Sequence, residues 1–353
     1  MARVVELKHG AGGSGMSSLL EEILGPVMDD DRIDDSSVPL ARLDDAGVAE
    51  GLALSTDTYT VRPLRFPGGD IGTVAYSGTV NDLSVMGARP VGLSSAVLVS
   101  AGFPYEELKE IMESMFQLAA GTGIPILSGD TKVVEAGAVD GLYINTAGMG
   151  VPSPHLESNE KVLAGYGGKR RTRWLSDSNL RDGDVIICSG TLGDHGVALM
   201  SLREGYGFHA SVQSDAAPLH GMISSALEVG GITACKDPTR GGLANLLNEW
   251  RDKSGAGIVI EGSAVPVREP VRSACDIMGM DPMSIGNEGK AVFAVVPEMA
   301  EEVLKALRGT TEGRDAAIIG RVSAEERYVV LETEVGGRRI LEAPIGDPVP
   351  RIC

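Results

Sequence analysis

Between residues 38 and 150, short apolar runs typical of β-strands alternate with a segment typical of an amphipathic helix. We predict strands at LALST, SAVLVS, PILSGD and LYINTAGMG, because strands favour short, largely apolar segments between polar turns. The stretch PYEELKEIMESMFQLAAGTG is predicted to be a helix that Pro104 opens and Gly121 ends. One face of this helix carries apolar side chains at helical spacing, namely Leu108, Ile111, Met112, Met115 and Leu118.

A second block of mixed pattern begins at DVIICSGTLGDHG and runs to about residue 335. It contains helix patterns in AAPLHGMISSALEVG, LANLLNEW and MAEEVLKALRG, and strand patterns in AVFAVV and RYVVLET. A chain of 353 residues is long enough for two domains. We therefore expect one domain over residues 38–150 and a second over residues 183–335.

Three segments lie outside the two predicted domains. Residues 1–37 form a predicted leader segment with a short strand, a glycine loop, a short helix and an acidic end. Residues 151–182 are mostly polar, and we expect a linker or exposed excursion whose basic cluster, GGKRRTR, is a solvated loop. Residues 336–353 form a tail in which helix is disfavoured by Pro344, Pro348 and Pro350.

The net charge of −18 argues against nucleic acid or an anionic membrane surface as the main partner. We expect no transmembrane helix and no signal peptide, because the sequence has no 18-residue apolar run and no apolar signal region. The four cysteines are too sparse for a disulfide scaffold and too widely spaced for a paired zinc motif. We expect a protein of the reducing cytoplasm, in which Cys188 is a small buried apolar residue.

Aspartates recur at the ends of the apolar runs in the first block. A single aspartate at such a place is usually a turn former or a helix cap. Several of them in one domain favour a site for Mg²⁺ and phosphate, because Mg²⁺ prefers hard oxygen ligands and takes the remaining ones from phosphates. The residues concerned are Asp44, Asp45, Asp57, Asp82 (which follows Asn81) and Asp130 (which lies near Lys132).

Two glycine-rich loops offer backbone N–H groups to an anion. The loop HGAGGSG, with Gly12 and Gly13, fits the spacing G-x-G-x-x-G, but no second strand follows to complete a dinucleotide-binding unit. This loop is either a plain glycine turn or a phosphate-contacting loop. In KDPTRGG, the residues Thr239, Arg240 and Gly241 precede a helix, where they form either a plain cap or an anion site.

Three further polar residues need an explanation. Glu288 lies in the glycine turn GNEGK, which is either a surface turn or part of a site, and His195 is expected to be structural.

Cys353 is the last residue, which is unexpected because chain ends are usually mobile and a loose thiol is prone to oxidation. An extended segment from Gly346 to Cys353 would span roughly 26 Å, long enough for the thiol to enter and leave a site.

Taken together and in order, FPGGDIGTVAYSGTVNDLSVMGARP, ILSGDTKVV, SGTLGDHG, KDPTRGGLANLLNE and the terminal PRIC resemble the HypE family of hydrogenase maturation factors, which are carbamoyl dehydratases. The ND and GD loops alone indicate the wider superfamily of aminoimidazole ribonucleotide synthetase, selenophosphate synthetase and thiamine-phosphate kinase. DPTRGG and the terminal PRIC narrow the resemblance to the family, and it covers nearly the whole chain. The sequence departs from the family pattern in reading GNEG after DPM.

The resemblance implies an α+β fold of the aminoimidazole ribonucleotide synthetase type. An N-terminal α/β domain would dimerise through its strands, and a C-terminal α+β domain would be followed by a flexible tail. ATP would bind between the domains near the dimer interface, in contact with Asn81, Asp82, Thr239, Arg240, Gly241, Gly12 and Gly13. Mg²⁺ would be held by Asp45 (or Asp44), Asp57, Asp82 and Asp130.

The resemblance also implies a reaction. Cys353 matches the cysteine that carries a carbamoyl group, which is dehydrated with ATP to a thiocyanate, while Lys132 and Glu288 match positions of the dehydration step. The product would supply the cyanide ligand of [NiFe]-hydrogenase iron, with the carbamoyltransferase HypF and the HypC–HypD iron scaffold as partners. The alternatives are another ATP-dependent synthetase or kinase acting on a small molecule, and a non-enzymatic protein whose terminal cysteine binds metal or forms a mixed disulfide.

Overall fold

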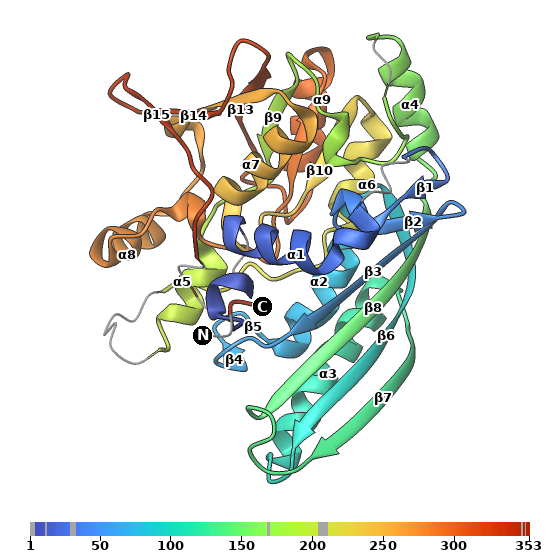
Figure 1. Cartoon of the computed structure of the whole chain (residues 1–353), viewed down its shortest axis with the longest axis vertical. Coiled ribbons are helices and arrows are strands. Elements are labelled where there is room, and N and C mark those ends of the chain that lie inside the picture. The colour runs from blue at the N-terminus through green and yellow to red at the C-terminus, as the bar shows by residue number, and fades with distance from the viewer. Residues whose placement is uncertain are drawn as a thin grey trace.

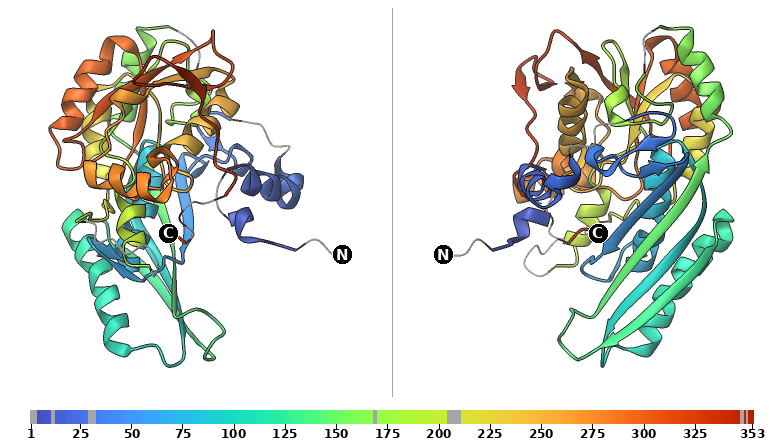
Figure 2. Two further views of the ribbon diagram at one scale, coloured as in Figure 1. Left: turned by 90° about the vertical axis from the view of Figure 1, so that its left-hand side faces the viewer. Right: turned by 45° about the vertical axis from the view of Figure 1, so that its right-hand side comes forward.

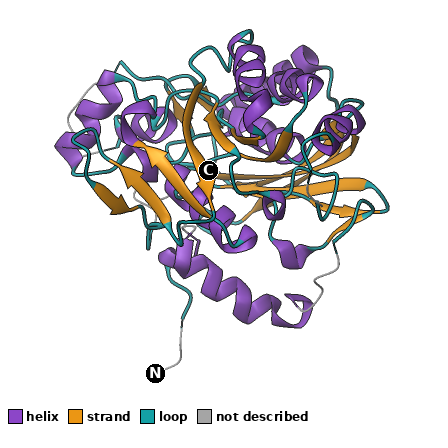
Figure 3. Cartoon of the chain, turned by 90° about the horizontal axis from the view of Figure 1, so that it is seen from above, coloured by secondary structure: helices purple, strands orange, loops and turns teal. Residues whose placement is uncertain are grey.

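The computed structural model describes residues 4–10, 13–28, 33–167, 170–203, 211–346, 349 and 351–353. Within them the chain builds two large β-sheets, one from residues 37–152 and one from residues 185–340 (Figure 1). Helices form most of the periphery, and the strands run between them (Figure 3). No helix in this part of the chain is long and apolar enough to cross a membrane.

The N-terminal sheet has six strands in the order β1-β2-β3-β8-β6-β7. Neighbouring strands are antiparallel except for β6 and β7, which are parallel. The four strands predicted from the sequence are confirmed as β3, β8, β6 and β7. The bounds are β1 Ser37–Val38, β2 Gly47–Ala49, β3 Leu52–Tyr59, β6 Ala88–Ser100, β7 Ile126–Val134 and β8 Leu142–Pro152.

Two helices, α2 (Ile71–Val85) and α3 (Tyr105–Thr122), cover one face of this sheet (Figure 1). A short hairpin of β4 (Arg65–Phe66) and β5 (Gly69–Asp70) precedes α2, and the Asp70 carboxylate caps it by accepting the Thr73 N–H at 2.9 Å. Helix α2 is buried almost throughout, because it lies between the sheet and the second domain.

The helix predicted from PYEELKEIMESMFQLAAGTG is confirmed as α3, and it buries Ile111 and Met115 against the sheet domain. Its end was predicted wrongly at Gly121. The helix continues to Thr122 and ends where Gly123 takes the left-handed conformation, with φ of 73°.

The C-terminal sheet has seven strands in the order β10-β12-β9-β13-β11-β14-β15. Helices α6 and α9 pack on one face of it and α7 packs on the other, so that two apolar layers enclose the sheet. The strands are β9 Val185–Cys188, β10 Ile232–Lys236, β11 Gly257–Glu261, β12 Val292–Val295, β13 Ala317–Ser323, β14 Val329–Glu332 and β15 Arg338–Ile340. The helices are α5 Asp194–Met200, α6 His220–Val229, α7 Gly242–Ser254, α8 Glu269–Met278 and α9 Ala300–Arg308.

The flanking segments differ from their predictions. Residues 7–10 form a 3₁₀ turn where a strand was expected, and the following helix α1 (Gly13–Met28) lies on one side of the molecule (Figure 2). The segment 151–182 is not a simple exposed linker. It contains α4 (Leu156–Ala164) and a completely buried Trp174, whose indole N–H donates to the Asp35 carbonyl at 3.1 Å.

Candidate functional site

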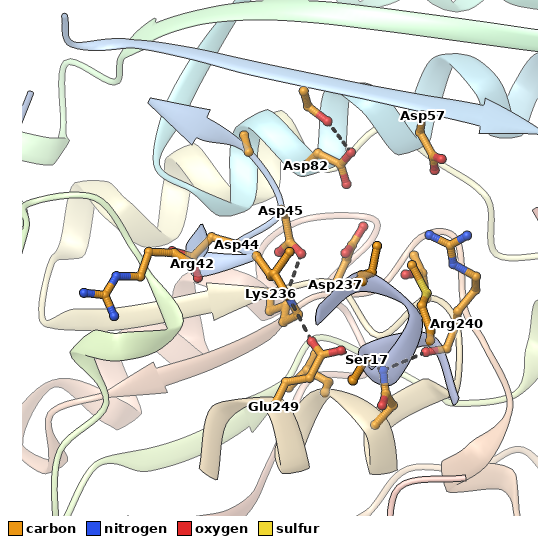
Figure 4. Close-up of a pocket in the computed structure, with 18 of the residues that line it drawn as sticks. Ser17, Arg42, Asp44, Asp45, Asp57, Asp82, Lys236, Asp237, Arg240 and Glu249 are labelled. Carbon is orange, nitrogen blue, oxygen red and sulfur yellow. Dashed lines mark hydrogen bonds and ion pairs between the residues drawn. The ribbon is translucent and has the colours of Figure 1, made fainter. Parts of the chain in front are cut away.

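A cavity of 710 Å³ lies between the two domains, within the size range of small-molecule sites. The sheet domain contributes β3, the loop before β2 and one face of α2. The second domain contributes the loop after β10 and one face of α7, and α1 closes another side (Figure 4). The last residue of the chain also lines the cavity.

Nine acidic side chains of the described residues line this cavity: Glu21, Asp44, Asp45, Asp57, Asp82, Asp237, Glu249, Asp252 and Glu288. Figure 4 shows four of them, Asp45, Asp57, Asp82 and Asp237, facing a common space. These four and Glu288 are the five carboxylates of the acidic wall. Burial raises the pKa of each of these five carboxyls. The charges of neighbouring carboxylates raise it further at Asp45, Asp82, Asp237 and Glu288, and the pKa of Asp237 reaches about 6, whereas at Asp57 the Arg240 charge acts to lower it. A bound cation would relieve this repulsion.

The carboxylates do not form a closed metal cage. Among the described residues, no three His, Cys, Asp or Glu side chains group closely enough to hold a metal ion by themselves. Mg²⁺ sites usually take only one or two protein carboxylates and complete their coordination with phosphate oxygens and water. The donor set fits Mg²⁺ bound together with a phosphorylated ligand.

Two buried lysines balance the acidic residues at the α7 end of the cavity. Lys236 contacts Asp45 at 2.5 Å and Asp177 at 3.4 Å, and Lys253 contacts Asp177 at 2.5 Å and Asp44 at 3.4 Å. Burial acts to lower the pKa of Lys236, but the Asp177 and Asp45 charges outweigh it and raise the pKa well above its usual range. Both members of the Asp44–Asp45 pair line the cavity and face a lysine.

The KDPTRGG motif, which begins at Lys236, brings a second cation, Arg240, to the cavity. Thr239 and Arg240 line the cavity, and Gly241 is the N-cap of α7 with φ of 77°. Gly242 also lines it, and a side chain there would meet the Ile285 carbonyl oxygen at 2.5 Å. The charge of Cys353, followed by those of Asp57 and Glu288, raises the pKa of Arg240.

The chain's last residue rests inside the site. Cys353 lines the cavity and is half-buried, and its carbonyl accepts the Thr60 N–H at 3.0 Å. Val349 and Ile352 are buried in the same apolar cluster as the core of the sheet domain. The tail is therefore packed against the protein at its end.

Several predicted site residues lie elsewhere. Gly13 lines the cavity, but Gly12 is outside the described residues. Asn81 is fully buried beside the cavity, where its side chain donates to the Ala217 and Glu288 carbonyls and accepts the Leu219 N–H. It joins the two domains instead of lining the cavity.

Asp130 and Lys132 also lie outside the cavity. They form an ion pair of 3.0 Å with each other on β7, and both side chains are mostly exposed. In the sheet, Asp130 on β7 pairs with Ala96 on β6, Ala96 pairs with Asn145 on β8, and Asn145 pairs with Thr58 on β3. Three strand spacings separate it from β3, a distance of about 14 Å. Neither residue lines the cavity.

Seven charged lining residues were missed by sequence reasoning: Glu21, Arg42, Lys236, Asp237, Glu249, Asp252 and Lys253. Lys236 ends β10 and Asp237 follows it in the same KDPTRGG motif, so the strand-end pattern used for the other aspartates could have found them. Glu249 and Lys253 lie one turn apart on α7, and a charged pair at that spacing is indistinguishable from an ordinary exposed helix face.

Comparison with known proteins gives two family matches. Residues 43–151 match the model of the AIR synthase related protein N-terminal domain, and residues 181–332 match the model of its C-terminal domain. The matched ranges contain most of the two sheets described above.

Individual relatives match over the full chain. The carbamoyl dehydratase HypE of Azotobacter vinelandii is 42% identical, over 99% of this chain and 97% of the relative. A crystal structure of a HypE–HypF complex contains a chain 41% identical, with a TM-score of 0.82 over 93% of this chain and all of that one. A crystal structure of HypE in complex with ATP is 39% identical, with a TM-score of 0.78 over 99% of this chain and all of that one.

Proposed function

Because this chain belongs to the HypE carbamoyl dehydratase family, we propose that it uses ATP to dehydrate a carbamoyl group on its own Cys353 to a thiocyanate. The observation that carries this proposal is the place of Cys353, which lines the same cavity as the five carboxylates and Arg240. A tail that enters a nucleotide site can present an amide to the γ-phosphate. An enzyme acting on a free small molecule would have no use for such a tail.

The chemistry solves a leaving-group problem. The amide oxygen of –S–C(=O)–NH₂ attacks the γ-phosphorus of ATP, and ADP leaves. The C–O bond then breaks, phosphate departs with its electron pair, and the two N–H protons are lost as the C≡N bond forms. S-carbamoyl and ATP thus give thiocyanate, ADP, phosphate and one proton.

The site residues have distinct roles in this reaction. Arg240 is suited to bind phosphate oxygens, because it is a half-buried, permanently charged cation in the loop before α7. Glu288 is suited to accept an N–H proton, because its Oε1 is buried and has no hydrogen-bond partner in the described part of the chain. Lys132 is assigned to orient the amide.

The carboxylates Asp45, Asp57, Asp82 and Asp130 are proposed to hold Mg²⁺, and Asp237 is added to this set. The support is the buried acidic wall itself, whose repulsion a divalent cation would relieve. Bound Mg²⁺ would neutralise charge on the transferring phosphoryl group.

We propose that the protein works as a homodimer formed through the N-terminal sheet. Strand β7 is an edge strand on which Leu127 and Val133 are 63% and 69% exposed, and an exposed apolar edge strand favours pairing with another chain. A second copy would carry Asp130 and Lys132 of one protomer toward the cavity of the other. This arrangement accounts for their distance from the cavity in their own protomer.

The proposed partners follow from the family. A solved relative is a complex of HypE with HypF, and we propose HypF as the donor of the carbamoyl group and HypC–HypD as the acceptor of cyanide for hydrogenase iron. We assign the reaction to the cytoplasm, because none of the four cysteines forms a disulfide and thiols persist in a reducing compartment.

A Cys353→Ser variant tests this function. It should bind ATP with unchanged affinity, because the serine fits the same space, but should form no ADP in response to the carbamoyl-transferring partner and carbamoyl phosphate. Cys275→Ser is the matched control and should behave as wild type in the coupled ADP assay. Carbamoyl-dependent ADP formation by Cys353→Ser would instead favour a small-molecule synthetase or kinase.

A further inference from the structure

We propose that four residues of the body, Thr60, Arg62, His195 and Arg203, form a clamp that holds the C-terminal tail by its main chain. In this clamp His195 is the positioning residue for Cys353. The clamp follows from the contacts themselves, whereas its role in catalysis rests on the proposed function.

Each of the last three residues is held by its carbonyl group. The Arg351 carbonyl accepts the Arg62 N–H at 3.2 Å and the Arg203 guanidinium at 3.3 Å. The Ile352 carbonyl contacts His195 Nε2 at 2.8 Å, and the main-chain oxygen of Cys353 accepts the Thr60 N–H at 3.0 Å and its hydroxyl at 3.2 Å. The tail therefore lies beside residues 60–62, which follow β3.

His195 is built to donate this hydrogen bond. Its ring is completely buried, it meets the Phe66 ring edge-on at 5.2 Å, and burial lowers the pKa of His195, which favours the neutral ring. Since a carbonyl only accepts, Nε2 must carry the proton, and Nδ1 then accepts from the Ser214 hydroxyl at 2.8 Å. The Ile352 carbonyl thus selects the tautomer of His195, and the Ser214 hydroxyl satisfies the other ring nitrogen.

Side chains of the tail anchor it on both sides of the clamp. Ile352 is 1% exposed within the apolar cluster that also contains Val349 and Ile285. Arg351 takes the left-handed conformation and turns outward, where it pairs with Asp140 at 2.6 Å and donates to the Thr60 carbonyl at 2.8 Å. The two anchors point in opposite directions and fix the rotation of the segment about its axis.

None of these contacts uses the Cys353 thiol. A clamp that binds carbonyls and neighbouring side chains can hold the tail whether the sulfur carries hydrogen, a carbamoyl group or a cyano group. The loop that carries Ser214 also contacts the residues around Glu288. Asp215, next to Ser214, accepts the Glu288 N–H at 3.2 Å and contacts Lys290 at 3.2 Å. One loop therefore contacts both His195, which holds the tail, and Glu288, the proposed base.

The test measures alkylation of Cys353 by iodoacetamide in the native full-length protein, followed by intact mass. The other three cysteines are at most 1% exposed, so the first adduct reports the tail. His195→Ala should raise the Cys353 alkylation rate about tenfold, the effect expected from losing one buried hydrogen bond. His195→Gln can still donate to the carbonyl and should stay within about twofold of wild type. His155→Ala, at a half-buried histidine of α4, is the control.

A second variant and a dehydration assay separate a failure of the clamp from unfolding and from a failure of the proposed function. Asp140→Asn weakens an exposed partner shared by Arg351 and the clamp residue Arg62, so it should raise alkylation at unchanged Tm even if His195→Ala unfolds. Wild-type alkylation rates in both His195→Ala and Asp140→Asn would overturn the clamp. If alkylation shifts as expected but carbamoylated wild-type protein loses no water with ATP, the clamp stands and the proposed function fails.

Discussion

At the scale of single residues, Glu288 is the clearest candidate for a group kept ready for chemistry. It is buried, one of its carboxylate oxygens has no hydrogen-bond partner among the described residues, and burial raises its pKa well above the usual range. Such an arrangement costs folding free energy, which is typical of a functional position.

We predict that Glu288→Gln slows dehydration of the carbamoylated tail by about 10²- to 10⁴-fold, the usual contribution of a general base. The variant should fold and should accept the carbamoyl group normally, because glutamine keeps the size of the side chain. Rapid quenching followed by peptide mass spectrometry measures both steps. Glu298→Gln, at an exposed position, is the control, and a wild-type dehydration rate in Glu288→Gln would remove it from the mechanism.

At the scale of secondary-structure elements, a buried charge network joins α7, β10 and the turn that contains Asp177. Asp177 contacts Lys236 and Lys253, and it accepts the Trp250 indole N–H at 2.8 Å. Burial acts to raise the pKa of Asp177, but the charges of Lys236 and Lys253 outweigh it and hold the pKa at about 2. The network fixes the position of the cavity wall.

Asp177→Asn should lower the free energy of unfolding by about 3–5 kcal/mol, because it leaves two buried lysines without this partner. Urea unfolding at pH 7 measures the loss. Since the folded pKa of Asp177 lies below its unfolded value, the stabilisation is present above about pH 4 and disappears as the pH falls toward 2. The variant should therefore approach wild-type stability at acid pH. A constant difference across that range would contradict this account.

Elements with a strong periodic pattern were predictable from the sequence, and those shaped by contacts with distant segments were not. Strands β3, β6, β7 and β8 and helix α3 carry enough apolar periodicity to be recognised alone. The segment around Trp174 has few apolar residues, and it is buried because Asp35 and the neighbouring loops cover it. Likewise, no local pattern indicated that His195 holds the tail or that Lys253 pairs with Asp44.

The candidate site was likewise predictable from the sequence only in part. Asp45, Asp57, Asp82, Thr239 and Arg240 were predicted from strand ends and loop chemistry, and all five line the cavity. The strand-end premise was wrong for Asp57, which lies within β3, and for Asp82, which lies within α2. The position of Asp130 and Lys132 depends on which strands become neighbours in the sheet, which a single sequence does not reveal. In their own protomer they lie away from the cavity on β7.

At the scale of the whole molecule, the proposed dimer makes each site depend on both protomers. Homodimers of Lys132→Ala and of Cys353→Ser should each be inactive. Mixing them in equal amounts should restore about a quarter of wild-type activity, because half of the dimers are mixed and one of their two sites is complete. Coupled ADP formation after subunit exchange measures this recovery. A mixture that stays inactive, while size-exclusion chromatography shows exchange, would place Lys132 outside the partner's site.

The most direct test of the proposed dehydration on Cys353 is the intact mass of the C-terminal peptide. It is measured after incubation with the carbamoyl-transferring partner, carbamoyl phosphate and ATP. We predict that the peptide ending in Cys353 gains one carbamoyl group and then loses one water, and that both changes are absent in Cys353→Ser. The central claim would be contradicted by a C-terminal peptide of unchanged mass in a mixture that forms ADP.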